Sequence, residues 1–285
     1  MPIFDGQGVK LFYKEKGDGQ PVVFVHGTVC DYRAWSAQAA ALSPSFRTIA
    51  YSRRYARPNE RHGDLMDSTV QNNSADLEAL IKGLGLDRVH LVGHSYGGFI
   101  AAYFASQHPD LLRSLVLVNA AVATMLASGT SAAASLGLLL RSPSVALSAR
   151  RLINATSATI KAADGGDRSA GEKIYVQQGI QGGRTGLPAK QQGFSEMVAE
   201  NVGTVKETTN PFPQLSVREV TNIRTPTLVV WGELSAPWDS RISEVLAKSI
   251  PGCESTKITG AGHFCLVEKP GEVSDCVKKF LLSHS

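Results

Sequence analysis

Short apolar runs recur along the chain, separated by intervals long enough to hold a helix. These runs lack the alternation of apolar and polar residues that marks a half-exposed strand. Continuous apolar runs suit parallel strands that are buried on both faces of a sheet. The predicted strands are Val22–Val25, Phe46–Tyr51, Val89–Val92, Ser114–Asn119, Thr227–Trp231 and the more polar Ser255–Thr259.

Helical patterns fill the intervals between these runs. The predicted helices are Tyr32–Leu42, Thr69–Leu84, Gly97–Gln107, Arg241–Ser249 and Val273–Leu282. Strands that alternate with helices predict a mostly parallel, doubly wound α/β sheet. The first residues differ, because Pro2–Asp5 and the alternating Val9–Glu15 flank a turn at Gly6–Gly8. That pattern predicts an antiparallel hairpin ahead of the parallel strands.

One interval, residues 120–224, contains no clear strand and is rich in Ala, Gly, Ser and Thr. Its helical stretches are separated by breaks at Asp164–Gly166, Gly182–Gly183 and Pro211–Pro213. A structureless loop of that length is improbable in a compact domain. The sequence therefore predicts a core of residues 1–119 and 225–285 and a helical cap of residues 120–224, inserted after the sixth strand. Because such breaks offer few fixed contacts, we expect the cap to be more mobile than the core.

Composition narrows the class of protein. The chain has 285 residues, 43% of them hydrophobic, and a formal net charge of +4 without a Lys/Arg-rich run, which argues against a nucleic-acid partner. The N-terminus lacks a signal-peptide pattern, and residues 120–140 are too rich in Ser, Thr and Gly for a membrane span. The four cysteines lack metal-ligand spacing. We expect a cytoplasmic monomer or homodimer with reduced thiols that binds a small molecule and no membrane.

The stretch Gly93–Gly97 reads G-H-S-Y-G and lies between an apolar run and a helical pattern. A serine on a sharp strand-to-helix turn needs a strained backbone and glycines where the chain packs closely. The start of the following helix also directs free N–H groups toward the serine, where negative charge would develop. The pattern predicts Ser95 as a nucleophile. The alternative is an ordinary glycine-rich turn.

The run Val22–Val25 ends in His26, Gly27 and Thr28. If this strand neighbours the one before Ser95, the backbone N–H groups of Thr28 and Tyr96 can bind an oxyanion together. His26 is interpreted as a structural residue that shapes the loop. A role as the catalytic base is the alternative.

His263 is the better candidate for that base. It follows the last predicted strand and stands in the glycine-flanked stretch Gly260–Phe264. It also comes after the serine and after a candidate acid in the chain, which is the order expected for this kind of scaffold. His263 is therefore predicted to take the proton of Ser95.

Together these motifs resemble the α/β-hydrolase superfamily. The resemblance rests on H-G-T at 26–28, G-H-S-Y-G-G at 93–98, P-T-L-V-V-W-G-E at 226–233 and G-A-G-H at 260–263. It implies the α/β-hydrolase fold, with Ser95 as nucleophile, His263 as base and the N–H groups of Thr28 and Tyr96 as oxyanion hole. It also implies a cap that roofs the substrate pocket. Haloalkane dehalogenases and epoxide hydrolases are set aside, because members of those groups need a carboxylate nucleophile.

The chain departs from the superfamily at the acid that orients the histidine. Ser235 stands where most relatives have an aspartate, and Asn119, at another place where relatives carry an acid, is an amide. The stretch G-E-L-S-A-P at 232–237 resembles a group of small hydrolases and lactonases with a glutamate in this loop. Glu233 is therefore predicted as the acid, since a triad needs a carboxylate within reach and not one residue type. Asp239, or no carboxylate at all, is the alternative.

The predicted activity is hydrolysis of a carboxylic ester or lactone of a small hydrophobic substrate through an acyl-enzyme on Ser95. The resemblance implies no metal and no organic cofactor. The alternatives are a C–C bond hydrolase of a diketone-like substrate, a non-hydrolytic cyclase and a small-molecule receptor. Arg53 and Arg54, after the predicted strand at 46–51, are interpreted as braces of their loop. Binding of an anionic or carbonyl-bearing substrate group is the other interpretation.

Overall fold

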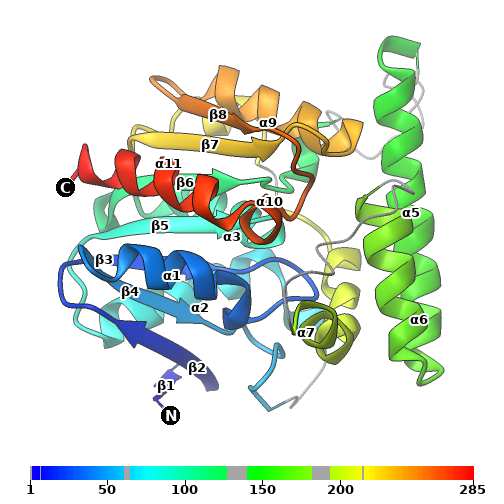
Figure 1. The fold of residues 1–285 in the computed structure, drawn as a ribbon, viewed down its shortest axis with the longest axis horizontal. Coiled ribbons are helices and arrows are strands. Elements are labelled where there is room, and N and C mark those ends of the chain that lie inside the picture. The colour runs from blue at the N-terminus through cyan, green and yellow to red at the C-terminus, as the bar shows by residue number, and fades with distance from the viewer. Residues whose placement is uncertain (1, 7, 61–64, 127–139, 182–192, 214) are drawn as a thin grey trace.

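The computed structural model describes residues 2–6, 8–60, 65–126, 140–181, 193–213 and 215–285. Within these ranges the strands form one eight-stranded sheet in the order β1-β2-β4-β3-β5-β6-β7-β8 (Figure 1). The strands are β1 (Ile3–Gly6), β2 (Val9–Lys16), β3 (Gln20–Val25), β4 (Phe46–Tyr51), β5 (Val89–His94), β6 (Leu112–Val118), β7 (Thr227–Gly232) and β8 (Glu254–Ile258).

The sheet is antiparallel at one edge and parallel elsewhere. β1 and β2 form the predicted hairpin, and β2 pairs antiparallel with β4. From β4 to β8 every neighbouring pair is parallel. All residues of β5 and β7 are buried, as expected for strands covered on both faces. Each predicted apolar run therefore became a strand, with bounds that differ by at most two residues.

Helices cover both faces of the sheet, which is the doubly wound arrangement (Figure 1). α1 packs beside α11, and α2 packs beside α3. The core helices are α1 (Ser36–Leu42), α2 (Val70–Gly83), α3 (Tyr96–Gln107), α9 (Pro237–Ser249), α10 (Cys265–Glu268) and α11 (Pro270–Leu282), with short 3₁₀ turns η1 (Tyr32–Trp35), η2 (Leu65–Asp67) and η3 (Pro109–Leu111). Local signals fix several starts: Thr69 Oγ1 accepts from Asn72 N–H to cap α2, and a proline opens α9 and α11.

A helical cap region follows β6, as predicted, and lies beyond the carboxyl ends of the parallel strands (Figure 1). Its elements are η4 (Ala123–Met125), α5 (Pro143–Asp164), α6 (Arg168–Lys173), the π-helix η5 (Ile174–Ile180), α7 (Phe194–Asn201), the 3₁₀ helix η6 (Val202–Thr209) and α8 (Val217–Val220). The breaks predicted at Asp164–Gly166 and Pro211–Pro213 separate elements, whereas Gly182–Gly183 and most of residues 120–140 lie outside the described residues.

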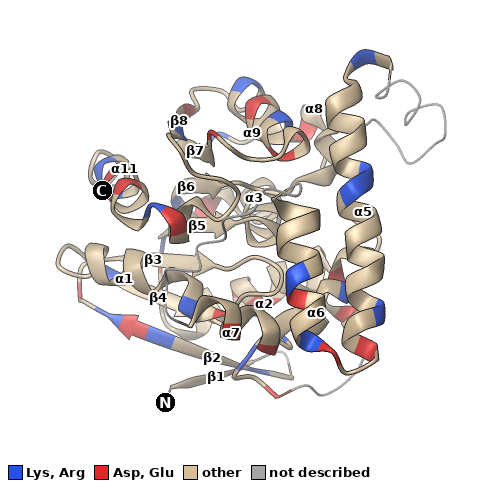
Figure 2. Cartoon of the chain, turned by 45° about the vertical axis from the view of Figure 1, so that its right-hand side comes forward, with Lys and Arg blue, Asp and Glu red and all other residues tan. Residues whose placement is uncertain are grey.

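Charged residues of both signs are scattered over the core, while α5 carries mainly basic ones (Figure 2). Along α5, Arg150, Arg151 and Lys161 precede its single acidic residue, Asp164.

Among the helices that the structure describes, none combines the length and the apolar character needed to cross a bilayer.

Candidate active site

Ser95 lies on the tight turn between β5 and α3. Its backbone is left-handed, with φ 53° and ψ −120°, a conformation that non-glycine residues rarely adopt outside functional turns. A Cβ atom at Gly97 would lie 2.3 Å from the carbonyl oxygen of Val25, and one at Gly93 would lie 2.5 Å from that of Gly97. The glycines on either side of Ser95 are thus required by the close packing that the sequence pattern predicted.

The loop after β8 brings His263 to Ser95. His263 Nε2 lies 2.9 Å from Ser95 Oγ, a hydrogen-bond distance, although 168 residues separate the two in the chain. The imidazole is buried against the rings of Trp238, Phe264 and His94. Packing on several sides fixes the orientation of this ring, so the structure joins the predicted nucleophile and the predicted base.

Asp239 is the carboxylate that contacts this histidine. His263 Nδ1 lies 2.8 Å from Asp239 Oδ2, and the Asp239 side chain is fully buried. Since the carboxylate can only accept, the hydrogen bond places the ring proton on Nδ1 and leaves Nε2 able to accept a proton from Ser95. The structure thereby joins Ser95, His263 and Asp239 in one continuous line of hydrogen bonds.

The contact predicted between Glu233 and His263 is not formed. The Glu233 N–H donates to the Ile258 carbonyl at 2.9 Å, and its exposed side chain accepts from the Gly260 N–H at 3.0 Å. The backbone of Glu233 therefore extends the pairing of β7 with β8, and its side chain points toward the loop after β8, away from His263. Asp239, the alternative to Glu233, faces inward from the first turn of α9.

Pro237 is the sequence signal for the position of Asp239. Periodicity alone predicts a helix from Arg241, which leaves Asp239 in a loop. The helix begins at Pro237 instead. Proline is favoured at the first helical position because its missing N–H would have no helical partner there. A helix that begins at Pro237 puts Asp239 in a first turn that can face the carboxyl ends of the strands.

Asn119 holds the carboxylate of Asp239 in place. It follows β6, is fully buried and has a φ of 44°. Its Nδ2 donates to Asp239 Oδ2 at 2.7 Å and to Ser235 Oγ at 2.8 Å. Its Oδ1 accepts from the Gly232 N–H at 3.3 Å, which fixes which way the amide points. The two positions where an acid was expected, Asn119 and Ser235, thus belong to the network around Asp239.

His94 and His26 are neutral structural residues beside this network. Burial first, and the neighbouring His263 second, lower the pKa of His94 to about 3. Its Nε2 lies 2.9 Å from the backbone oxygen of His263, so it supports the loop that carries the base. Burial, and then the cation of Arg53, lower the pKa of His26 well below its usual value. His26 Nε2 accepts from the Arg53 N–H at 2.9 Å, and its Nδ1 bonds the Gly27 carbonyl, as expected of a loop-shaping residue.

Arg53 and Arg54 both brace their loop, which is the interpretation that the sequence favoured. Arg53 is 1% exposed and pairs with Glu207 of the cap at 2.7 Å. Arg54 donates two hydrogen bonds of 2.7 Å to the carboxylate of Asp76 on α2. Neither side chain lines the cavity beside Ser95.

A cavity of about 410 Å³ opens beside Ser95 between the core and the cap. Its volume is within the range of about 300–1,000 Å³ usual for small-molecule sites. Among the described residues, none that lines it is charged. The lining comprises Thr28, Ser95, Tyr96, Ala121, Ala123, Leu126, Ala149, Leu152, Ile153, Thr156, Ser157, Tyr175, Ile180, Thr208, Thr209, Phe212, Trp238 and Ile242. Thr28 follows β3 and Tyr96 begins α3, so the two residues predicted for the oxyanion hole meet Ser95 at this cavity.

The described residues contain no group of three or more His, Cys, Asp or Glu side chains placed to hold a metal ion. The cysteines are free thiols, and burial raises the pKa of Cys30 and Cys265. A raised pKa keeps a thiol in its unreactive protonated form.

Comparisons with known proteins agree with this architecture. Epoxide hydrolase 3 of Xenopus tropicalis is 32% identical over 115 residues, which cover 40% of this chain and 31% of that protein. A non-heme chloroperoxidase of Kitasatospora aureofaciens is 37% identical over 131 residues, 45% of this chain and 47% of that protein. The chain thus matches less than half the length of each of these curated relatives.

Similarity in structure extends over the whole chain. An esterase of Exiguobacterium antarcticum superimposes with a TM-score of 0.78 at 18% identity, covering 98% of both chains, which shows a shared fold. A family model described as the alpha/beta hydrolase fold matches residues 20–270. This match includes the turn at Ser95, the cap and the loops that carry Asp239 and His263, and the chain belongs to the alpha/beta hydrolase fold family.

Proposed function

We propose that this protein is a serine hydrolase that cleaves a carboxylic ester or lactone through an acyl-enzyme on Ser95. The observation that carries the proposal is the line of hydrogen bonds from Ser95 Oγ to His263 and from His263 to Asp239, at 2.9 and 2.8 Å. A nucleophile in contact with a base that a third group orients is the arrangement needed for nucleophilic acyl transfer.

The reaction follows from the positions of these groups. His263 Nε2 takes the hydroxyl proton as Ser95 Oγ attacks the carbonyl carbon of the substrate. The carbonyl oxygen becomes an oxyanion, which accepts hydrogen bonds from the backbone N–H groups of Thr28 and Tyr96. The imidazolium then gives its proton to the leaving alkoxide, which departs as an alcohol from an ester and stays on the acyl chain as a hydroxyl group when a lactone is opened. Water attacks the acyl-enzyme by the same route, releasing a carboxylic acid and the free hydroxyl of Ser95.

Asp239 is assigned as the acid of this triad. Its buried carboxylate keeps the proton of His263 on Nδ1 and balances the positive charge of the imidazolium that forms during each step. The amide of Asn119 donates to the same carboxylate oxygen as His263 does, at 2.7 Å. Glu233 lies on the exposed side of this loop and supports only the turn at Gly260.

The substrate class follows from the cavity. Because none of the described side chains that line it is charged, a charged substrate would lose its hydration there without gaining a partner among them. Apolar side chains from α5 and α9, such as Leu152, Ile153 and Ile242, would bury a hydrophobic acyl or alcohol group. Tyr175 and Thr156, each of which carries a hydroxyl group, also line this cavity. We infer a small, neutral and mainly apolar ester, of which a lactone is the cyclic form.

A screen of p-nitrophenyl esters of increasing acyl length, together with aliphatic lactones and a β-diketone, tests this function. Ser95→Ala serves as the control in every reaction. We expect turnover of esters or lactones that Ser95→Ala abolishes. Cleavage of the β-diketone alone, detected by product analysis, would instead identify a C–C bond hydrolase. Binding without turnover of any compound by a folded sample would refute the hydrolase and favour a receptor or cyclase on this scaffold.

A further inference from the structure

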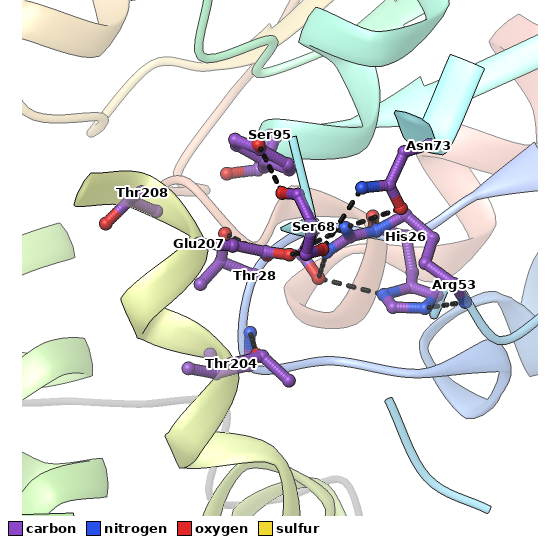
Figure 3. Close-up of polar contacts among 12 residues, drawn as sticks. His26, Thr28, Arg53, Ser68, Asn73, Ser95, Thr204, Glu207 and Thr208 are labelled. Carbon is purple, nitrogen blue, oxygen red and sulfur yellow. Dashed lines mark hydrogen bonds and ion pairs between the residues drawn. The ribbon is translucent and has the colours of Figure 1, made fainter. Parts of the chain in front are cut away.

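A buried carboxylate of the cap, Glu207, contacts the loop that carries the oxyanion donor Thr28 (Figure 3). Glu207 lies on η6 and is 1% exposed. Its Oε1 accepts from Thr28 Oγ1 at 2.9 Å and from Arg53 Nη2 at 2.7 Å. Its Oε2 accepts from Arg53 Nη1 at 2.9 Å and from Ser68 Oγ at 3.0 Å. Four donors from three core segments therefore converge on one side chain of the cap.

A second residue of η6, Thr204, holds the next position of the same loop. The backbone N–H of Val29 donates to Thr204 Oγ1 at 3.0 Å. Val29 has a φ of 59°, in the left-handed region that a β-branched residue strongly disfavours. Such a conformation persists only where surrounding contacts impose it. Thr204 supplies one of those contacts from across the boundary between cap and core.

Arg53 connects this cluster to the rest of the loop. Its Nε donates to the His26 carbonyl at 2.9 Å, and its Nη2 donates to the Gly27 carbonyl at 3.3 Å. The Gly27 carbonyl and the Thr28 N–H belong to the same planar peptide group. Because Arg53 fixes the direction of this carbonyl, it also fixes the direction of the Thr28 N–H. The guanidinium that fixes them is itself neutralised by Glu207, with which it forms a two-pronged ion pair.

The same cluster reaches the other oxyanion residue, Tyr96. The guanidinium carbon of Arg53 lies 5.1 Å from the centre of the Tyr96 ring, a cation–π distance. The Tyr96 hydroxyl donates to the Ser68 carbonyl at 3.2 Å, and the Ser68 hydroxyl donates to Glu207. Both residues that flank Ser95 at the proposed oxyanion hole are thus tied to one carboxylate.

We propose that Thr204 and Glu207 are positioning residues of the oxyanion hole, so that η6 and the loop of Thr28 and Val29 form one preorganised unit. This inference rests on the proposed hydrolase function, since it concerns the donors that stabilise the oxyanion. It assigns to part of the cap a role in catalysis that is separate from covering the substrate. The oxyanion hole is complete only when η6 is docked on the core.

Thr204→Val is the sharpest test of this role. It keeps the shape of the side chain and removes the acceptor of the Val29 N–H. The matched control is Thr159→Val, because Thr159 is also a buried cap threonine but its hydroxyl bonds the Gly171 carbonyl within the cap. The measurements are kcat and KM for the best ester of the screen, and inhibition by a trifluoromethyl ketone that resembles that ester and forms an oxyanion on Ser95.

We expect Thr204→Val to lower kcat by about 10-fold, less than the roughly 10²–10³-fold that removing an oxyanion donor outright costs. KM should stay within about twofold, and the trifluoromethyl ketone should bind weaker by a factor similar to the loss in kcat. Thr159→Val should leave all three quantities close to those of the unmodified protein. If Thr204 had only a structural role, Thr204→Val would lower the melting temperature. The affinity for the trifluoromethyl ketone would then change no more than KM for the ester.

Glu207→Gln is a second, independent test of the proposal. The amide keeps one acceptor oxygen but leaves the buried guanidinium of Arg53 without a counter-charge, so we expect a larger loss in kcat together with lower stability. If Thr204→Val and Thr159→Val are indistinguishable in kcat and inhibitor affinity while the unmodified enzyme is active, the inference is wrong. If the unmodified enzyme turns over no ester or lactone, the proposed function fails instead, and the two failures are distinct.

Discussion

The side chains of this site divide into those that a sequence motif positions and those that tertiary packing positions. Ser95 and His263 stand in short motifs whose glycines are needed locally, so both could be found from the sequence. Asp239 could be named only as an alternative, because its role depends on where α9 begins and on the amide of Asn119, which meets it only in the folded chain. Glu233 carries the negative charge expected of the acid and lies in the loop expected to hold it. Its backbone N–H, however, bonds the end of β8, and its side chain bonds the N–H of Gly260.

A pair of conservative substitutions tests this assignment. Asp239→Asn should lower kcat by at least about 10²-fold and toward the roughly 10⁴-fold loss seen when such an acid is replaced by an amide, because His263 would adopt the wrong tautomer. Glu233→Gln should stay within about threefold of the unmodified enzyme, since glutamine can still accept from the Gly260 N–H. Ester hydrolysis by both variants, after circular dichroism has confirmed their folding, is the measurement. An active Asp239→Asn beside an inactive Glu233→Gln would return the role to Glu233.

At the scale of elements, the strands and core helices follow from the sequence more closely than the cap does. Runs such as Val22–Val25 are apolar on both faces of the strand, so their composition alone predicts that they are buried. The cap is different, because η5 is a π-helix and η6 a 3₁₀ helix whose conformations no periodicity indicates. What holds η6 is a core loop distant in sequence, through Thr204 and Glu207. The sequence therefore predicts that a helical cap exists, but not which part of it is fixed.

The contacts of the cap predict unequal exchange of its backbone amides with solvent. Of the 22 residues of α5, only Val145, Ala155 and Thr159 are buried, so little packing opposes its local opening. Hydrogen exchange followed by mass spectrometry should show faster exchange in α5 than in β5 or β6. η6, tied to the core by Glu207, should exchange more slowly than α5. Equal protection of α5 and β5 would contradict a mobile cap, and faster exchange in η6 than in α5 would contradict the docked unit proposed here.

For the whole molecule, the parallel sheet explains how residues far apart in sequence meet. Thr28, Ser95, Asn119 and His263 follow four different strands, and Asp239 lies in the first turn of the helix after a fifth. The carboxyl ends of parallel strands share one edge of a sheet, which is where ligands of open α/β sheets bind. The cap lies at that edge (Figure 1). That these residues lie at one edge of the sheet could be predicted from the order of strands and helices. The apolar lining of the cavity could not, because it depends on which faces of the cap helices point toward the core.

Buried neutral histidines predict how the stability of the whole fold depends on pH. Burial first, and the cation of Arg113 second, lower the pKa of His90 to about 4, whereas an unfolded histidine titrates near 6.5. Between these values the unfolded chain binds a proton that the folded chain does not, so stability falls as the pH drops below about 6.5. At about 1.4 kcal/mol per unit, His90 alone costs roughly 2 kcal/mol at pH 5.

Urea unfolding at pH 7 and pH 5 measures this contribution when it is compared with His90→Gln. His90 bonds Ser114 and Gln20 on neighbouring strands, away from the cavity beside Ser95. The variant should lose less stability between the two pH values than the unmodified protein does, by about 2 kcal/mol. An identical loss in both proteins would show that His90 does not resist protonation in the folded state.

Peptide mapping by mass spectrometry after brief exposure to a fluorophosphonate tests the central claim most directly. The reagent reacts with a serine hydroxyl only where a base removes its proton and oxyanion donors face the phosphoryl oxygen. Among the serines that the structure describes, Ser95 alone has His263 at 2.9 Å and borders the cavity with Thr28 and Tyr96. We predict rapid labelling of Ser95 and no other serine, slowed strongly in Asp239→Asn. A label on a different serine, or none on a folded sample, would contradict the account.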